Sequence, residues 1–198
     1  MTKRKVEETV NATFAGLALF YRDTDLSETL ISRYQTGQII MERGFTDMTY
    51  KTGGLKGNFR YLIASSAGKD LSAINPSFAR YGHIVLHSGA YFKVLDVYRT
   101  GDKTQVLLLN IPADAISFFR NTAIGLEEEL VKKARENFDQ WSTASPVEEL
   151  QAPEWTGRIE FPLGMNDEGE LFFVGTEEVD EEEPPPPPRK KPWWRFGR

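Results

Sequence analysis

The sequence predicts an α+β fold with a mixed or antiparallel central sheet, flanking helices and a disordered C-terminal tail. Hydrophobic residues make up 40% of the 198 residues, which is enough to bury a core. One 17-residue stretch, GLEEELVKKARENFDQW (125–141), repeats its apolar residues at helical spacing. Segments rich in Val, Ile, Leu and aromatic residues, which favour strands, occupy 59–66, 83–88, 91–98 and 105–111.

The strand pattern also indicates how the sheet is arranged. Residues 105–111 (QVLLLNI) are apolar with little alternation, which is typical of an interior strand covered on both faces. The intervening RTGDK (99–103) contains Gly101 and predicts a hairpin between 91–98 and 105–111. Residues 157–175 are expected to form two short strands around the turn NDEG.

Three further segments have helix or loop signals. A short helix is expected over 26–35, capped by Asp25 and closed by Gly37. Pro112 marks a helix start before the longer helix 125–141. Residues 142–155 have the composition of a connector.

The N-terminus and the cysteine count bear on location. The apolar run 12–21 is too short to span a bilayer and is preceded by Glu7 and Glu8, so we read it as a buried element of a cytoplasmic protein. With no cysteine, the chain has no disulfide scaffold and no thiolate metal site.

Charge is distributed in blocks that suggest three regions. Residues 1–121 have 15 basic against 11 acidic residues and form the main α+β region. Residues 122–183 have 4 basic against 18 acidic; within them, 122–175 are expected to add a helix and a hairpin packed on the main region. Residues 176–198 form the tail, which begins acidic, continues through five prolines and ends basic and aromatic.

No catalytic motif is recognisable. SSAGKD (65–70) follows a predicted strand, but it lacks the first glycine and the final hydroxyl of a phosphate-binding loop. The two histidines, His83 and His87, lie on one face of a predicted strand about 13 Å apart, too far to share one metal. We therefore expect no metal site and no cofactor.

One alternative gives these histidines a function. Together with Arg60 and Lys69, His83 and His87 form a candidate phosphate-binding set for a protein that binds or processes phosphate-bearing substrates or RNA. Basic and aromatic residues interleave over 53–83, as in single-strand binders, but the basic excess is small, so packing is favoured over nucleic-acid binding.

The tail carries the strongest functional signal. The aromatic and arginine residues Trp193, Trp194, Arg195 and Phe196 are expected to anchor a protein partner at the end of a polyproline spacer. Electrostatic steering would come from Arg189, Lys190 and Lys191. Docking on its own domain, binding to an anionic membrane surface, binding through the prolines and a purely solubilising role remain alternatives.

The sequence thus favours a non-enzymatic interaction or adaptor protein that docks through its C-terminal tip. A further alternative is an inhibitor or assembly protein that binds through the acidic face of 122–183.

Overall fold

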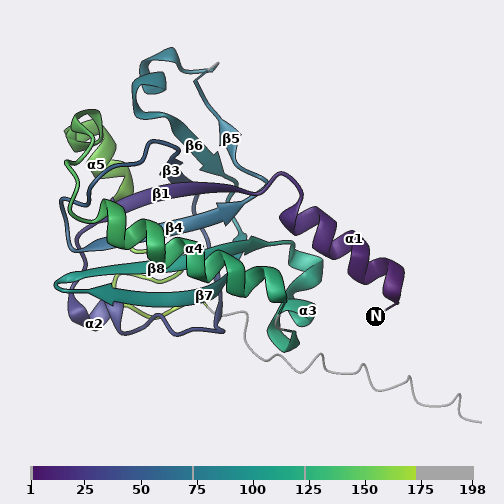
Figure 1. Cartoon of the computed structure of the whole chain (residues 1–198). Helices are drawn as coiled ribbons and strands as arrows, with labels where there is room; N and C mark the ends of the chain where they lie inside the picture. Colours follow the sequence, from purple (N-terminus) through teal and green to yellow (C-terminus); the bar gives the residue numbers. More distant parts are fainter. Residues whose placement is uncertain (1, 73, 123, 173–198) are drawn as a thin grey trace, which may run out of the picture.

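The computed structural model describes residues 2–72, 74–122 and 124–172, which form one mixed sheet with helices packed on it (Figure 1). The strand order is β2-β7-β8-β4-β1-β3-β6-β5. This arrangement confirms the predicted α+β class with a mixed sheet and flanking helices. The strands are β1 (Ala18–Thr24), β2 (Ile39–Glu42), β3 (Thr46–Thr49), β4 (Phe59–Ser65), β5 (Lys69–Asp70), β6 (His83–Leu86), β7 (Ala90–Thr100) and β8 (Lys103–Ile111).

Helices and 3-10 turns fill the connections between strands. The helices are α1 (Lys3–Phe14), α2 (Glu28–Ile31), α3 (Ile116–Asn121), α4 (Gly125–Trp141) and α5 (Pro153–Ile159). The 3-10 turns are η1 (Pro76–Tyr81), η2 (Ala113–Ala115) and η3 (Glu148–Gln151). None of the helices in the described ranges is long and apolar enough to cross a membrane.

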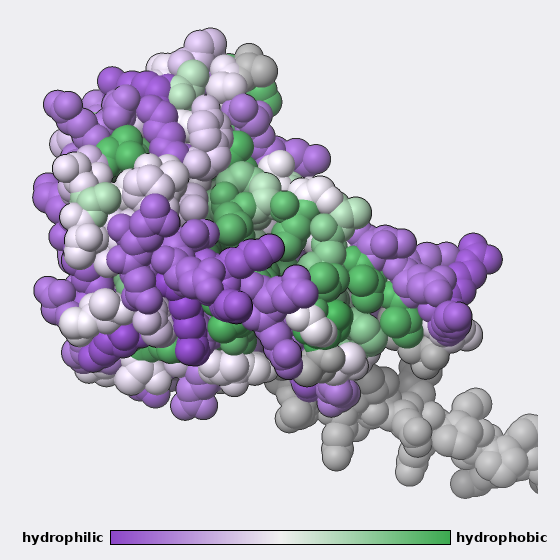
Figure 2. Space-filling model, in the orientation of Figure 1, coloured by the Kyte–Doolittle hydropathy of each residue, from purple (hydrophilic) through white to green (hydrophobic). Residues whose placement is uncertain are grey.

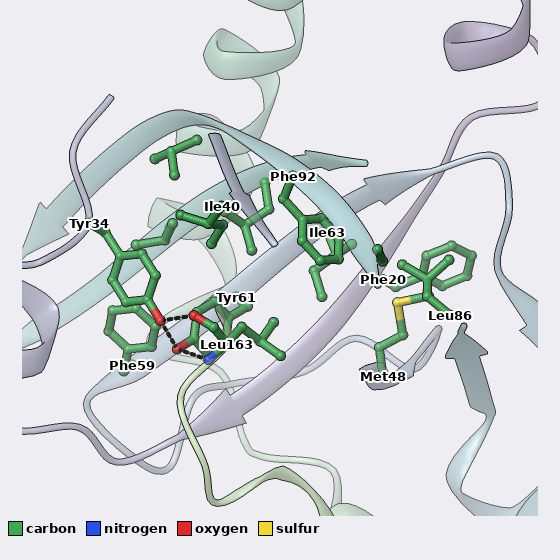
Figure 3. Packing of buried hydrophobic residues seen from close by; sticks show 14 of the residues in the cluster. Phe20, Tyr34, Ile40, Met48, Phe59, Tyr61, Ile63, Leu86, Phe92 and Leu163 are labelled. Carbon is green, nitrogen blue, oxygen red and sulfur yellow. Dashed lines mark hydrogen bonds between the residues drawn. The ribbon is translucent and has the colours of Figure 1, made fainter. Parts of the chain in front are cut away.

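The centre of the sheet is buried on both faces, as the apolar runs predicted. β8 pairs with β7 in an antiparallel hairpin and with β4 in parallel. On one face, Phe59, Tyr61 and Ile63 of β4 pack with Tyr34 and Phe92 (Figure 3). On the other face, apolar residues of β4 and β8 pack against α3 and α4. Alternate residues of each strand therefore enter two separate cores.

The predicted helix over 125–141 is confirmed as α4. Ala134 and Phe138 of its apolar stripe are buried, whereas Leu126 and Trp141 are 45% and 37% exposed. Figure 2 shows the charged outer surface of α4 and, beside it, apolar residues gathered between α4 and α1.

Several local expectations were wrong. The helix expected over 26–35 is confined to α2, and its N-cap is Ser27, whose hydroxyl accepts a hydrogen bond from the Leu30 amide. The apolar run 12–21 does not form one element, because α1 ends at Phe14 and β1 begins at Ala18. Instead of the two strands expected after residue 157, the chain continues α5 and then forms one isolated bridge, Met165 to Leu171.

The sheet has a weak joint between β1 and β3. β1 pairs with β4 along its whole length, whereas β1 and β3 are in register only where Tyr21 meets Thr49. Beyond that pair the two strands part, and α5 packs against both of them. At this junction of β1, β3 and α5 the polar side chains of Arg22, Thr46 and His83 are buried.

Candidate functional site

Arg22 lies in the junction and is almost fully buried, at 4% exposure. Its Nη1 donates to the carbonyl oxygen of Asp47 at 3.2 Å, and its Nη2 donates to that of Phe161 at 2.7 Å. The guanidinium therefore replaces strand pairing where β1 and β3 separate, and it ties both strands to the segment that follows α5. Burial lowers the pKa of Arg22 from its usual value, because the charged form loses hydration.

His83 lies at the same junction, beside Asp47. Its Nε2 is 2.5 Å from Oδ1 of Asp47, and its ring packs edge-on against Trp155 of α5, with centroids 5.5 Å apart. Arg158 brings a second cation to the same carboxylate, with Nη1 3.8 Å from Oδ1. A carboxylate that holds one ring nitrogen leaves the other free to accept or donate a proton.

Three buried side-chain atoms of the described residues have no hydrogen-bond partner, and all three lie at this junction. They are Nε of Arg22, Oγ1 of Thr46 and Nδ1 of His83. Each belongs to a residue that contacts Asp47 or adjoins it in sequence. Leaving a buried polar atom unpaired costs about 1–3 kcal/mol, so three such atoms at one place call for an explanation.

A cavity of about 510 Å³ adjoins the junction, which is within the usual range for small-molecule sites. We call it the Trp155 pocket; Thr49 and Trp155 form the wall that it shares with the junction. At its inner end Arg60 binds Asp23 through two hydrogen bonds of 2.7 and 2.6 Å and donates a third to the Gly53 carbonyl oxygen. Arg60 is buried, and these three hydrogen bonds tie Asp23 of β1 and the Gly53 backbone to β4 at this end of the pocket.

The glycines that line the pocket are required by packing. A Cβ on Gly54 would lie 1.7 Å from the carbonyl oxygen of Ala144, and one on Gly53 would lie 2.8 Å from the side chain of Val147. The segment that leads to η3 therefore lies directly on the 53–54 backbone. These glycines close the pocket and are not a phosphate-binding loop.

The pocket presents both signs of charge to solvent. Lys56 is exposed and has no ion-pair partner among the described residues, whereas Lys51 pairs with Glu149 at 3.2 Å. The exposed carboxylates Asp25 and Glu160 lie on the same cavity. Lys56 is thus available to an anion, and the carboxylates are available to hydroxyl or amino groups.

The four residues of the candidate phosphate-binding set do not share one cleft. Arg60 is on β4, which β1 and β3 separate from His83 on β6. His83 is buried, whereas His87 is exposed, with its Nδ1 2.7 Å from the Ser88 carbonyl oxygen. Lys69 is exposed on β5, opposite Val85. Only Arg60 lines the Trp155 pocket, and there its charge is already paired.

The remaining predicted residues are placed as follows. The tail residues 189–191 and 193–196 lie outside the described part of the chain. Within the acidic region, Glu127 does not belong to an exposed face, because it is buried in an ion pair with Lys93 at 2.9 Å. No cluster of His, Asp or Glu within the described ranges is suited to hold a metal ion.

Sequence reasoning missed most of the junction. Arg22 gave one signal, because an arginine in the middle of the strand-like segment ALFYRDT is unusual for a buried strand. Asp47 and Trp155 gave none, since they are brought to His83 only by the pairing of β3 with β6 and by the packing of α5.

Comparison with known proteins shows no family. No protein-family model matches the chain, and no curated protein matches it. Among solved structures, exoenzyme S from Pseudomonas aeruginosa, in complex with human 14-3-3 protein beta, has a TM-score of 0.43 at 15% identity and covers 65% of this chain and 63% of its own. The ADP-ribosyltransferase HopU1 of Pseudomonas syringae pv. Tomato has a TM-score of 0.41 at 21% identity, over 48% and 46% of the two chains. The type III effector XopAI from Xanthomonas axonopodis pv. citri has a TM-score of 0.42 at 17% identity, over 52% and 44%.

These neighbours correct the functional expectation. One of the three is named as an exoenzyme, one as an ADP-ribosyltransferase and one as a type III effector, and these names contradict the prediction of a non-enzymatic adaptor protein. The chain spans less than two thirds of the length of each of these structures. Because the TM-scores are below 0.5, the likeness carries no argument for a particular activity.

Proposed function

We propose that this chain is an enzyme that binds a small, nucleotide-sized organic anion in the Trp155 pocket and transfers protons through His83. The observation that carries the proposal is the position of the His83–Asp47 pair and its unpaired Nδ1, directly behind the wall of a ligand-sized cavity.

The Trp155 pocket would provide the groups that bind the ligand. Lys56 is its unpaired cation and would meet the anionic group of the ligand, while Asp25 and Glu160 would accept hydrogen bonds from hydroxyl or amino groups. The partly exposed apolar side chains of Val147 and Leu150 offer a surface for a planar ring. A ligand that carries both a negative group and several hydroxyls satisfies these features together.

The junction of β1, β3 and α5 would provide the groups that transfer protons. Because Asp47 binds Nε2, Nδ1 is the ring nitrogen left to act as a general base. The fixed charge of Arg22 is placed to stabilise negative charge that develops nearby. Trp155 separates Nδ1 from the pocket, so the proposal requires this side chain to move when ligand binds.

Binding is tested first. We would titrate the full chain with AMP, ATP, ribose 5-phosphate, inorganic phosphate and NAD⁺ by isothermal calorimetry; NAD⁺ is included because of the neighbours' names. We expect saturable binding of at least one organic probe and about 10-fold weaker binding by Lys56→Gln, equivalent to about 1.4 kcal/mol. Lys69→Gln is the matched control, since Lys69 is equally exposed but does not line the pocket. Equal affinity of the wild type and Lys56→Gln would refute the binding site.

Chemistry is tested on the probe that binds. We expect chromatography to detect turnover of that probe by the wild type and its loss in His83→Asn, with the dissociation constant changed less than about threefold. Arg80→Gln is the control, because Arg80 neighbours this cluster through Tyr81 but contacts neither His83 nor Asp47. Undiminished turnover by a folded His83→Asn variant would remove His83 from the mechanism.

A further inference from the structure

We propose that a groove along α4 binds the last ten residues of this same chain, RKKPWWRFGR (189–198). The groove has a volume of about 620 Å³ and lies between α4 and β7, away from the Trp155 pocket. We call it the α4 groove. It is lined by the 36–37 turn, the 93–95 stretch of β7 and the face of α4 between Glu127 and Asp139.

The floor of the groove is apolar. The side chain of Leu95 comes from β7 and that of Val131 from the facing side of α4. Val94 lines the groove with its backbone, because its side chain is buried in the core on the other face of the sheet. The ladder between β2 and β7 ends where Ile39 meets Lys93, and the amide and carbonyl of Val94 still bond to residues 38 and 37. Beyond Val94, β7 continues as an edge of the sheet. An apolar floor beside an unpaired strand edge suits an extended segment with large apolar side chains.

The rim of the groove is negative once its ion pairs are taken into account. Lys93 is neutralised by Glu127 at 2.9 Å, and Arg135 binds Asp96 through two hydrogen bonds of 2.8 and 2.7 Å.

The rim charges that remain are mostly carboxylates. Glu128 and Glu136 are exposed and have no ion-pair partner among the described residues. Asp139 accepts hydrogen bonds from the hydroxyls of Tyr98 and Thr100 and has no ion-pair partner among the described residues. Against these three carboxylates stands one unpaired cation, Lys132. The groove therefore favours a ligand that is both apolar and cationic.

The C-terminal segment has this composition. Residues 189–198 contain five basic residues, no acidic residue, and the aromatic side chains of Trp193, Trp194 and Phe196. The aromatic rings match the apolar floor, and the basic side chains match the carboxylates of the rim. Aromatic and arginine side chains are those that most often supply the binding energy of such contacts.

The place where the described chain ends is consistent with this assignment. The carbonyl oxygen of Phe172 accepts a hydrogen bond of 3.0 Å from the Met41 amide in β2, the strand that adjoins β7. Sixteen residues, 173–188, then precede the proposed segment. A chain of that length spans at most about 55 Å, whereas neighbouring strands are about 5 Å apart and a packed helix lies about 10 Å from its sheet. Attachment to the same chain also gives the segment a high effective concentration at the groove.

Hydrogen–deuterium exchange on the full chain tests the proposal. We expect Trp193→Ala/Trp194→Ala to raise the exchange of amides in 93–98 and 127–139 at least several-fold and to leave β4 unchanged. Glu128→Gln/Glu136→Gln should have the same effect in weaker form. The matched control is Glu129→Gln/Glu148→Gln, which removes the same charge from exposed positions outside the groove. Raising the salt concentration should weaken the protection in the wild type and the control alike.

The other outcomes overturn the proposal. Identical exchange in the wild type and the double tryptophan variant would show that the segment does not occupy the groove. Protection that the control removes as strongly as Glu128→Gln/Glu136→Gln would show a non-specific charge effect. Protection that depends on protein concentration, with a dimer detected by light scattering, would place the segment in the groove of a second copy.

Discussion

Replacing Tyr34 by phenylalanine tests whether a buried hydroxyl pair anchors the segment after α5. The Tyr34 hydroxyl donates to the carbonyl oxygen of Leu163 at 2.7 Å and lies 2.6 Å from the Tyr61 hydroxyl (Figure 3). The Tyr61 hydroxyl in turn accepts a hydrogen bond from the Leu163 amide at 3.0 Å. Two tyrosines from the core thus satisfy both backbone groups of one residue in that segment.

The expected cost follows from the groups left unpaired. Tyr34→Phe keeps the ring that stacks on Phe59 at 5.9 Å, but it removes the donor to Leu163 and the acceptor for the Tyr61 hydroxyl. Two buried polar groups left unpaired, at about 1–3 kcal/mol each, lower the free energy of unfolding by about 2–6 kcal/mol. Tyr61→Phe leaves only the Leu163 amide unpaired, so it should cost about 1–3 kcal/mol.

The assay is urea denaturation of both single variants and the double variant. The double variant leaves two buried polar groups unpaired, whereas the two single variants together leave three. The loss of unfolding free energy in the double variant should therefore be smaller than the sum of the two single losses by about 1 kcal/mol or more. Tyr98→Phe is the control, since its hydroxyl bonds Asp139 at an exposed site and should cost less than about 1 kcal/mol. Additive costs, or a Tyr34→Phe cost no larger than that of the control, would refute the reasoning.

Two further predictions concern pH and backbone packing. Burial raises the pKa of Tyr61 to about 12, while the unfolded chain releases this proton near pH 10, so stability should fall between pH 10 and 12 by up to about 3 kcal/mol. Urea unfolding at pH 9 to 11.5 should show this loss, and Tyr61→Phe should make it shallower; an unchanged slope would contradict it. Gly54→Ala should cost about 1–3 kcal/mol and weaken ligand binding in the Trp155 pocket, because its Cβ meets the Ala144 backbone at 1.7 Å. Gly125→Ala is the control, because its Cβ would meet nothing within 4 Å, and it should be neutral or stabilising in thermal melts. Equal effects of the two substitutions would contradict the prediction, since they would show that residues 144–147 move aside at little cost.

The sequence predicted those elements whose pattern is local. Helix α4 follows from apolar residues spaced for one helical face. The β7–β8 hairpin and the interior position of β8 follow from apolar runs around a glycine turn. The sequence did not predict α1, because that helix buries little more than Thr9 and Thr13 and therefore lacks a long apolar stripe.

The candidate site depended on contacts that no local pattern records. Arg22, Asp47 and His83 belong to three different strands, and they meet only because β3 lies between β1 and β6 and barely pairs with β1. Trp155 reaches His83 from a segment that its composition marked as a connector.

By itself the sequence determined the α+β class, the long helix, the central strands and the basic aromatic composition of the C-terminal segment, because each depends on neighbouring residues in the chain. Only the tertiary structure decided which charges are buried and paired, such as Arg60 with Asp23 and Lys93 with Glu127, and which remain available. Burial and pairing arise from the crossing of strands distant in sequence, and they determine which side chains are able to meet a ligand.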